Sequence, residues 1–168
     1  MNTLTIDIRS AEPRDAGQIA DVHHCAWQGA YAGIIPYRAL NAMISRRGSA
    51  WWANAIRRAA TVLVIEIGGT IAGYATVGRN RARELPQQGE VYELYLRPEY
   101  QGVGLGSRLL EAAREKLVAH GLQGMVIWAL EDNVNALAFY EGAGGRDVAE
   151  GVEVFDQKAL RKIAFVWD

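Results

Sequence analysis

The stretch from residue 90 to residue 110 limits the possible folds of this chain more than any other. It reads EVYELYLRPEYQGVGLGSRLL: an apolar β-type run, a stop at Pro98, a glycine-rich loop and the start of a helical pattern. Glycine has no Cβ, so Gly102, Gly104 and Gly106 allow positive φ and a close approach of the backbone to a ligand. Amides of such a loop converge at the positive end of the following helix, where phosphate groups bind. The stretch predicts a strand, an anion-binding loop and a helix.

Two common nucleotide-binding motifs do not fit this loop. A P-loop requires a lysine directly after its last glycine, but Gly106 is followed by Ser107 and Arg108. A dinucleotide-binding fingerprint requires a third glycine three positions after the second, where this chain has Ser107. The spacing therefore disfavours a module that binds ATP or NAD. The pattern that does fit is Gln101-x-x-Gly104-x-Gly106, following a strand that ends in LRPEY.

This pattern resembles the GNAT superfamily of acetyl-CoA-dependent N-acetyltransferases, in which a Gln/Arg-x-x-Gly-x-Gly/Ala loop binds the pyrophosphate of coenzyme A through backbone amides. The resemblance covers nearly the whole chain and is strongest from residue 90 to residue 142. It implies an α/β GNAT fold, with a mixed, twisted central sheet of about seven strands flanked by helices. A β-α-β unit would form the part that binds CoA. The alternative for the loop alone is a glycine-rich turn joining a strand to a helix.

Length and composition limit the class of protein further. The chain has 168 residues, half of them hydrophobic, which suits a single domain over residues 1–168. A net charge of −1 gives no basic surface for nucleic acid or an anionic membrane. Cys25 is the only cysteine, which excludes a disulfide framework and a thiolate metal cluster and fits a reducing cytoplasm. No stretch approaches the length of a membrane span, so we expect a cytoplasmic protein. We also expect that the protein requires no metal.

Hydrophobic periodicity predicts the order of the elements. Strands are expected at 3–9, 61–67, 70–77, 90–96 and 125–130, with a closing hairpin at 146–155 and 160–167; helices are expected from 15 to a break at Gly29, from Pro36 toward 43, and at 49–60, 105–119 and 133–142. The strands at 90–96 and 125–130 should be parallel, because helix 105–119 connects them as a right-handed crossover. Gly145 stands where relatives have an aromatic residue, which predicts weaker packing after the helix at 133–142.

The resemblance assigns the CoA-binding residues by position. The pantetheine arm would bind backbone groups of Leu94 to Leu96, at a point where neighbouring strands separate, and the amide near Leu94 would donate to the thioester oxyanion. The loop from Gln101 to Gly106 would bind the pyrophosphate. The predicted cofactor-binding set is Leu94, Tyr95, Leu96, Gln101, Gly102, Val103, Gly104, Leu105, Gly106, Asn133 and Tyr140.

Tyr140 is the candidate general acid. Residues 133–140 match the family pattern Asn-x-x-Ala-x-x-Phe-Tyr, in which the tyrosine protonates the departing thiolate. A phenol, with an ordinary pKa of about 10, is protonated at neutral pH, whereas an ordinary carboxylate is ionised. Asn133 would bind the pantetheine arm, cap the helix, or do both. The alternative for Tyr140 is an aromatic side chain that packs the short helix.

The base that deprotonates the acceptor ammonium has two candidates, Glu90 and Glu93. Strand alternation places Glu90, Tyr92 and Leu94 on one face and Glu93 on the other, although a bulge would change this. We favour Glu90, acting through a water molecule; the alternative for both glutamates is a solvated charge at a strand end. Trp27 and Tyr31 are candidate substrate-facing aromatics, with packing in the core or a lid as the alternative.

The resemblance thus implies an enzyme that moves an acetyl group from acetyl-CoA to a primary amine of a small-molecule or peptide acceptor. The amine would attack the thioester directly, so Cys25 has no assigned role. Acidic residues near the site favour a cationic acceptor. The runner-up is a catalytically silent acyl-CoA-binding or sensor domain on the same fold. No motif encodes the oligomeric state, and a homodimer formed through the C-terminal strand stays open.

Overall fold

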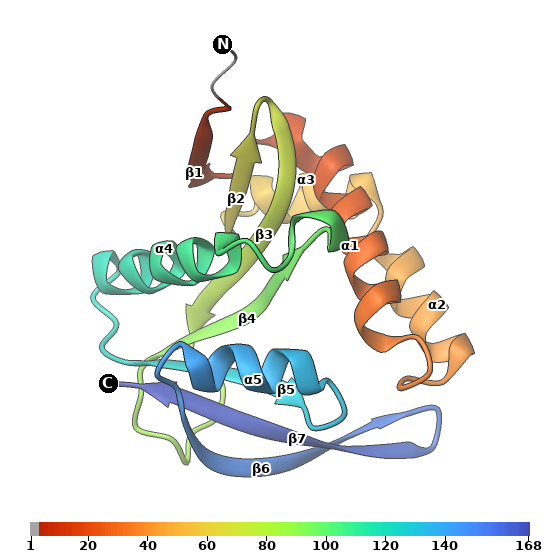
Figure 1. Ribbon diagram of the computed structural model, residues 1–168, viewed down its shortest axis with the longest axis vertical. Coiled ribbons are helices and arrows are strands. Elements are labelled where there is room, and N and C mark those ends of the chain that lie inside the picture. The colour runs from red at the N-terminus through yellow and green to blue at the C-terminus, as the bar shows by residue number, and fades with distance from the viewer. Residues whose placement is uncertain (1–3) are drawn as a thin grey trace.

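The computed structural model describes residues 4–168 and confirms the predicted α/β architecture. One mixed sheet has the strand order β1-β2-β3-β4-β5-β7-β6, with helices on both faces (Figure 1). Its strands are β1 (Ile6–Ser10), β2 (Thr61–Ile67), β3 (Thr70–Arg79), β4 (Gly89–Leu96), β5 (Met125–Leu130), β6 (Arg146–Phe155) and β7 (Lys158–Trp167). The helices are α1 (Ala16–Tyr31), α2 (Tyr37–Arg46), α3 (Ser49–Arg57), α4 (Leu105–Ala119) and α5 (Val134–Gly142). None of the helices in residues 4–168 is long and apolar enough to cross a bilayer.

The central feature of the sheet is the pair formed by β4 and β5. They are parallel, as the β-α-β pattern predicts, whereas all other strand pairs are antiparallel. Their pairing runs only from Gly89 opposite Met125 to Val91 opposite Ile127. The rest of β4 continues to Leu96 in register with β3 alone among the described strands. The two strands therefore separate in the second half of β4.

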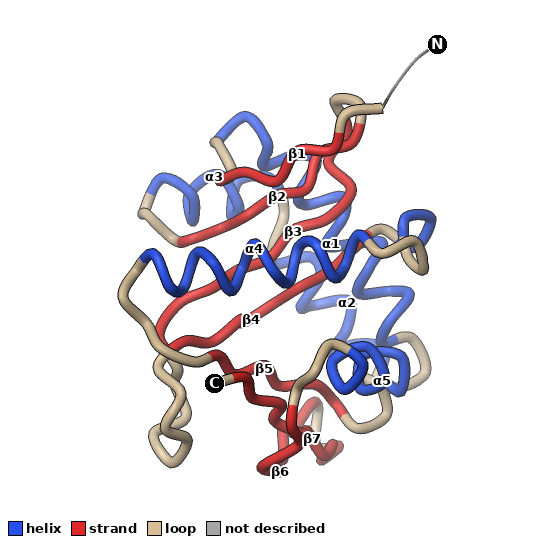
Figure 2. Tube along the Cα trace, turned by 60° about the vertical axis from the view of Figure 1, so that its left-hand side comes forward, coloured by secondary structure: helices blue, strands red, loops and turns tan. Residues whose placement is uncertain are grey.

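Helices cover the sheet on both sides. Figures 1 and 2 show α4 and α5 on one face and α1, α2 and α3 on the other. The apolar stripe of α4 packs on the first face and includes Leu109, Ala113 and Leu117, each at most 1% exposed. On the opposite face, Ile19 of α1 and Trp52 of α3 pack with Tyr74 of β3. The amphipathic periodicity of the helices therefore predicts which side chains reach the sheet.

Several element boundaries differ from the predictions, and the differences in the first strand and the first helix bear on the site. The first strand begins at Ile6, and Thr3 lies outside the described residues. Helix α1 does not break at Gly29 but continues to Tyr31, so that expectation was wrong. A Cβ at Gly29 would lie 3.7 Å from the Pro98 ring, which places α1 in contact with the turn after β4. That distance is an ordinary van der Waals contact, so Gly29 lies at the helix-to-turn contact within a continuous helix and an alanine would fit there.

The space beside Gly145 is filled by the penultimate residue of the chain. A Cβ at Gly145 would lie 2.7 Å from the Trp167 ring and 2.9 Å from the Tyr140 carbonyl oxygen. Trp167 is 6% exposed, and its indole N–H donates to the Ala143 carbonyl oxygen at 3.1 Å. The expected loss of packing after α5 was therefore wrong, because Trp167, at the end of β7, supplies the aromatic contact.

Replacing Gly145 with alanine should lower the free energy of unfolding by about 1–3 kcal/mol, because the added methyl overlaps Trp167. Urea unfolding at constant pH measures the loss. Gly142→Ala is the matched control, since a Cβ there meets nothing within 4 Å and the residue belongs to α5. Equal effects of the two substitutions would contradict this account of the packing.

Candidate active site

The separation of β4 from β5 brings side chains from three elements together. Tyr31 of α1 and Tyr95 of β4 share a hydrogen bond between their hydroxyl oxygens at 2.6 Å. Burial raises the pKa of Tyr31, while the hydrogen bond to Tyr95 and the nearby side chain of Asn133 oppose that rise. The Asn133 side chain also caps α5, accepting from the amide of Ala136 at 3.3 Å. Residues from α1, β4 and the start of α5 thus meet where the strands separate.

The glycine loop has the predicted position between β4 and α4. Gly102 and Gly104 have φ of 80° and 83°, and residues 101–104 are exposed. Gln101 holds the loop against β4, because its side-chain amide donates to the Leu96 carbonyl oxygen at 3.2 Å. The amides that open α4 follow Gly104 directly. This arrangement can hold an anion through backbone groups alone.

Gly106 differs from Gly102 and Gly104 in backbone conformation. It lies in the first turn of α4 and does not have a positive φ, so the expected positive φ was wrong at this position. A Cβ there would lie 3.2 Å from the ring of Phe139. The absent side chain allows α4 and α5 to approach each other, which sets the position of α5 relative to the loop.

Tyr140 lies on α5, enclosed by aromatic side chains. It is 6% exposed, with ring centroids 5.9 Å from Phe165 and 6.3 Å from Trp167. None of the hydrogen bonds among residues 4–168 involves its hydroxyl group. Burial raises the pKa of the phenol, which therefore keeps its proton at neutral pH. Its hydroxyl group can donate to a ligand atom, because no protein acceptor in the described part of the chain holds it.

Glu93 and Glu90 lie on the same face of β4, so the predicted separation onto opposite faces was wrong. The register places Glu93 opposite Thr76 but Val91 opposite Val77, which makes Tyr92 an extra residue in β4. Such a bulge reverses the alternation for every residue beyond it. Both carboxylates consequently point toward the side that α1 and α3 cover.

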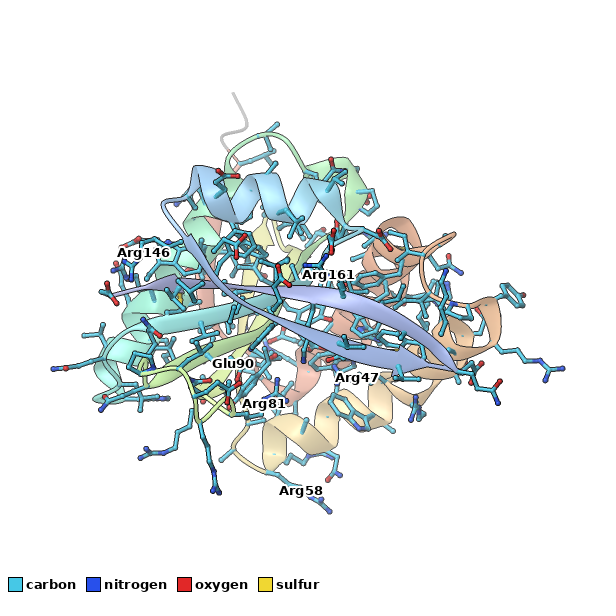
Figure 3. All side chains as sticks on the ribbon, turned by 90° about the horizontal axis from the view of Figure 1, so that it is seen from below. Arg47, Arg58, Arg81, Glu90, Arg146 and Arg161 are labelled. Carbon is cyan, nitrogen blue, oxygen red and sulfur yellow. The ribbon has the colours of Figure 1, made fainter. Side chains whose placement is uncertain are left out.

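The two glutamates have different surroundings. Glu90 is 2% exposed and accepts from the Arg81 backbone amide at 3.0 Å and guanidinium at 2.9 Å (Figure 3). Glu93 forms an ion pair with Arg47 and accepts from the Thr76 hydroxyl group at 3.4 Å. Burial raises the pKa of Glu93, and Arg47 opposes that rise. A carboxylate with a raised pKa is a better proton acceptor than an ordinary one.

The predicted aromatics Trp27 and Tyr31 lie on the same face of the sheet as Glu93. Both are 8% exposed, and their rings lie 5.6 Å and 6.3 Å from the ring of Tyr95. Two surface hollows of about 370 and 450 Å³ lie elsewhere, lined by the β3–β4 loop and by the last turns of α4. Those hollows contain none of the predicted site residues.

Sequence reasoning missed His23 and Arg47. His23 is not among the site residues predicted from the sequence, yet it is fully buried, and its Nδ1 lies 2.9 Å from the Tyr74 hydroxyl oxygen. Its spacing from Ile19 places it on the buried stripe of α1, so periodicity could have found it. Arg47 lies between α2 and α3 and has no motif around it, and only the fold brings it to Glu93.

Comparisons with known proteins agree with this geometry. Residues 23–144 match the model of the acetyltransferase (GNAT) family. The N-acetyltransferase YuaI of Bacillus subtilis is 30% identical over 162 residues, covering 96% of this chain and 92% of YuaI. Among solved structures, PaiA N-acetyltransferase of Thermoplasma acidophilum, in complex with coenzyme A, gives a TM-score of 0.75 at 20% identity, covering 94% of this chain and 98% of PaiA. YncA of Salmonella typhimurium, with acetyl-CoA, gives 0.70 at 22% identity, covering 97% and 93%.

His23 should make the protein less stable in acid. Burial lowers its pKa to about 4 from an ordinary value of 6.5, so the unfolded chain binds the proton more tightly. Its contribution is present above the ordinary value and is lost as the pH falls from 6.5 toward 4. The free energy of unfolding should fall by about 2 kcal/mol between about pH 7 and about pH 5 through this group. Urea titrations should show that His23→Gln removes this decrease and that His24→Gln, at an exposed position, keeps it. A decrease that persists in His23→Gln would contradict the assignment.

Proposed function

The chain belongs to the GNAT family of acetyltransferases and is an N-acetyltransferase, and from this premise we propose the donor, the catalytic residues and the acceptor. The donor is acetyl-CoA, the acceptor is a primary amine of a small molecule or peptide, and the amine attacks the thioester directly. The observation that carries the proposal is the separation of β4 from β5 after Val91, in the strand that leads to the exposed loop at residues 101–104. The solved relatives PaiA and YncA, which share the fold, contain coenzyme A and acetyl-CoA respectively.

The donor binds through backbone groups. The amides of Gly102, Val103, Gly104, Leu105 and Gly106 hold the pyrophosphate, supported by the positive end of α4. Gln101 positions this loop, because its own amide donates to the Pro98 carbonyl oxygen at 3.2 Å. The backbone of Leu94, Tyr95 and Leu96 holds the pantetheine arm, because this half of β4 lacks β5 as a neighbour. The Leu94 amide donates to the oxyanion that develops on the thioester carbonyl. Asn133, at the start of α5, contacts the arm as well as capping the helix.

Tyr140 acts as the general acid. When the amine attacks, the carbon–sulfur bond breaks and the sulfur leaves as a thiolate that requires a proton. The buried phenol carries that proton at neutral pH, and no protein acceptor among residues 4–168 holds its hydroxyl group. Donation from Tyr140 lowers the free energy of the departing thiolate relative to the bound thioester.

Glu93 acts as the base. This assignment replaces Glu90, which the sequence favours. Arg81 occupies both carboxylate oxygens of Glu90, which suits Glu90 to hold the loop after β3. Glu93 lies nearer the separated half of β4 and shares its face with Tyr95, which contacts both Trp27 and Tyr31. We therefore assign Trp27 and Tyr31 to the acceptor side, and Glu93 to removal of the ammonium proton.

Tyr140→Phe should lower kcat by about 100-fold while leaving the Kd for coenzyme A unchanged, because only the transferable proton is lost. Release of the free thiol, measured with an amine panel, gives kcat, and calorimetry gives Kd. Tyr92→Phe is the matched control, since its hydroxyl group donates to the Arg79 carbonyl oxygen away from the proposed site. Unchanged turnover in Tyr140→Phe would remove this residue from the acid role, and absence of acetyl transfer by the parent protein would leave a CoA-binding domain.

Activity should fall as the pH drops through the raised pKa of Glu93, because only the ionised form accepts the ammonium proton. The acidic limb of kcat/KM should therefore lie above the ordinary glutamate value of about 4.3. Glu93→Gln should remove this limb and most of the activity. Glu90→Gln should keep the limb and mainly lower stability, since it breaks the contacts with Arg81. A limb that disappears only in Glu90→Gln would reverse the assignment.

A further inference from the structure

Arg47 extends from the junction of α2 and α3 into a group of aromatic rings and ends on Glu93. Its guanidinium carbon lies 4.6 Å from the ring centroid of Trp51 and 5.9 Å from those of Trp27 and Trp52. These distances are within the range of about 6 Å over which aromatic faces attract cations. Figure 3 shows Arg47 apart from the pair formed by Arg81 and Glu90. We call the set Trp27, Trp51, Trp52, Thr76 and Glu93 the cation box.

The cation box has the chemistry of a site for an ammonium group. Three indole rings supply faces that attract a cation, and the carboxylate of Glu93, 9% exposed, supplies the opposite charge. The Thr76 hydroxyl group holds the second oxygen of the carboxylate. Trp52 closes the inner side at 0% exposure, and Trp51 forms the outer side at 42%. The exposed ring of Trp51 therefore marks the solvent side of the box.

The cation now in the box is a side chain of the protein itself, Arg47. Arg47 follows the last turn of α2, and its side chain is 31% exposed on a flexible stem. A guanidinium keeps its proton at every relevant pH, so it cannot give Glu93 the proton that a base takes from an acceptor. If Glu93 accepts the proton of the acceptor ammonium, that ammonium must come to the carboxylate that Arg47 now contacts.

We propose that the cation box is the acceptor subsite and that Arg47 occupies it as a stand-in for the acceptor ammonium, leaving when the acceptor binds. This inference rests on the proposed function, which assigns the base to Glu93. The acceptor is a primary ammonium on an apolar or aromatic body, because indole faces line the box. Glu93 would repel an acceptor that carries a carboxylate of its own. Arg47 is a specificity-determining residue that excludes cations which bind the box more weakly than a tethered guanidinium.

The test is a tryptophan-fluorescence titration with 2-phenylethylammonium, which has an aromatic body and one ammonium. Arg47→Met keeps the length of the stem and removes the competing cation, so it should bind this probe about tenfold more tightly than the parent protein. Arg46→Met is the matched control, because Arg46 is the preceding residue, is exposed and makes no contact with Glu93 in the described structure. It should bind like the parent protein. Adding Glu93→Gln to Arg47→Met should abolish the gain, and 2-phenylethanol, which has no charge, should show none.

Equal or weaker probe binding by Arg47→Met would overturn the proposal, as would a gain that survives in the double variant. Because Arg47→Met leaves Glu93 without its partner, a second measurement uses the parent protein alone. The NMR signal of the Arg47 Nε–H group should move toward that of an exposed arginine when 2-phenylethylammonium saturates the site, and a bound probe with an unmoved signal would also overturn it.

These binding measurements separate the inference from the proposed function. They require no acetyl transfer, so a gain in Arg47→Met without turnover of any amine would leave the cation box in place and refute the enzymatic assignment. Amine turnover by the parent protein, without tighter probe binding in Arg47→Met, would support the enzymatic assignment and refute the cation box as the acceptor subsite.

Discussion

The arrangement of the site depends on one constraint, the separation of β4 from β5 after three paired positions. Backbone N–H and C=O groups require partners, and the second half of β4 has none from β5. The same strand leads directly into the loop with positive φ at Gly102 and Gly104. Strand β5, on the other side of the gap, leads into α5, which carries Asn133 at its start and Tyr140 near its end. The topology therefore brings the proposed thioester arm, pyrophosphate and acid to the gap between β4 and β5, in the middle of the sheet, with few specialised side chains.

The two faces of the sheet divide the proposed chemistry between donor and acceptor. The face under α4 and α5 carries Leu94 and the residues against which α4 packs. The face under α1, α2 and α3 carries Glu93 and Tyr95. A buried carboxylate is costly unless it is paired, and Arg47 meets that requirement for Glu93. The bulge at Tyr92 decides the division, because it turns Glu93 toward the aromatic face.

The sequence was sufficient for the elements whose signals are local. The structure confirms the positions predicted for four such elements. They are the hairpin formed by β2 and β3, helix α4 with its apolar stripe, strand β5 with its continuous apolar run, and the glycine loop. The bulge at Tyr92 was not predictable, because alternation alone assumes a regular strand. Contacts between distant segments were also hidden, as with Trp167 over Gly145 and Arg47 on Glu93. These pairs depend on how the sheet closes, and no local pattern encodes them.

The central claim, that the loop after β4 holds the pyrophosphate of coenzyme A, is tested most directly by calorimetric titration of CoA into two glycine variants. Gly104 and Gly69 have φ of 83° and 85°, and a Cβ at either meets nothing within 4 Å. Alanine disfavours this conformation at both positions by about 1–3 kcal/mol, but only Gly104 orients the amides of the loop. The account predicts that Gly104→Ala raises the Kd for CoA by about tenfold or more and that Gly69→Ala leaves it unchanged. Equal CoA affinity in both variants and the parent protein would contradict it.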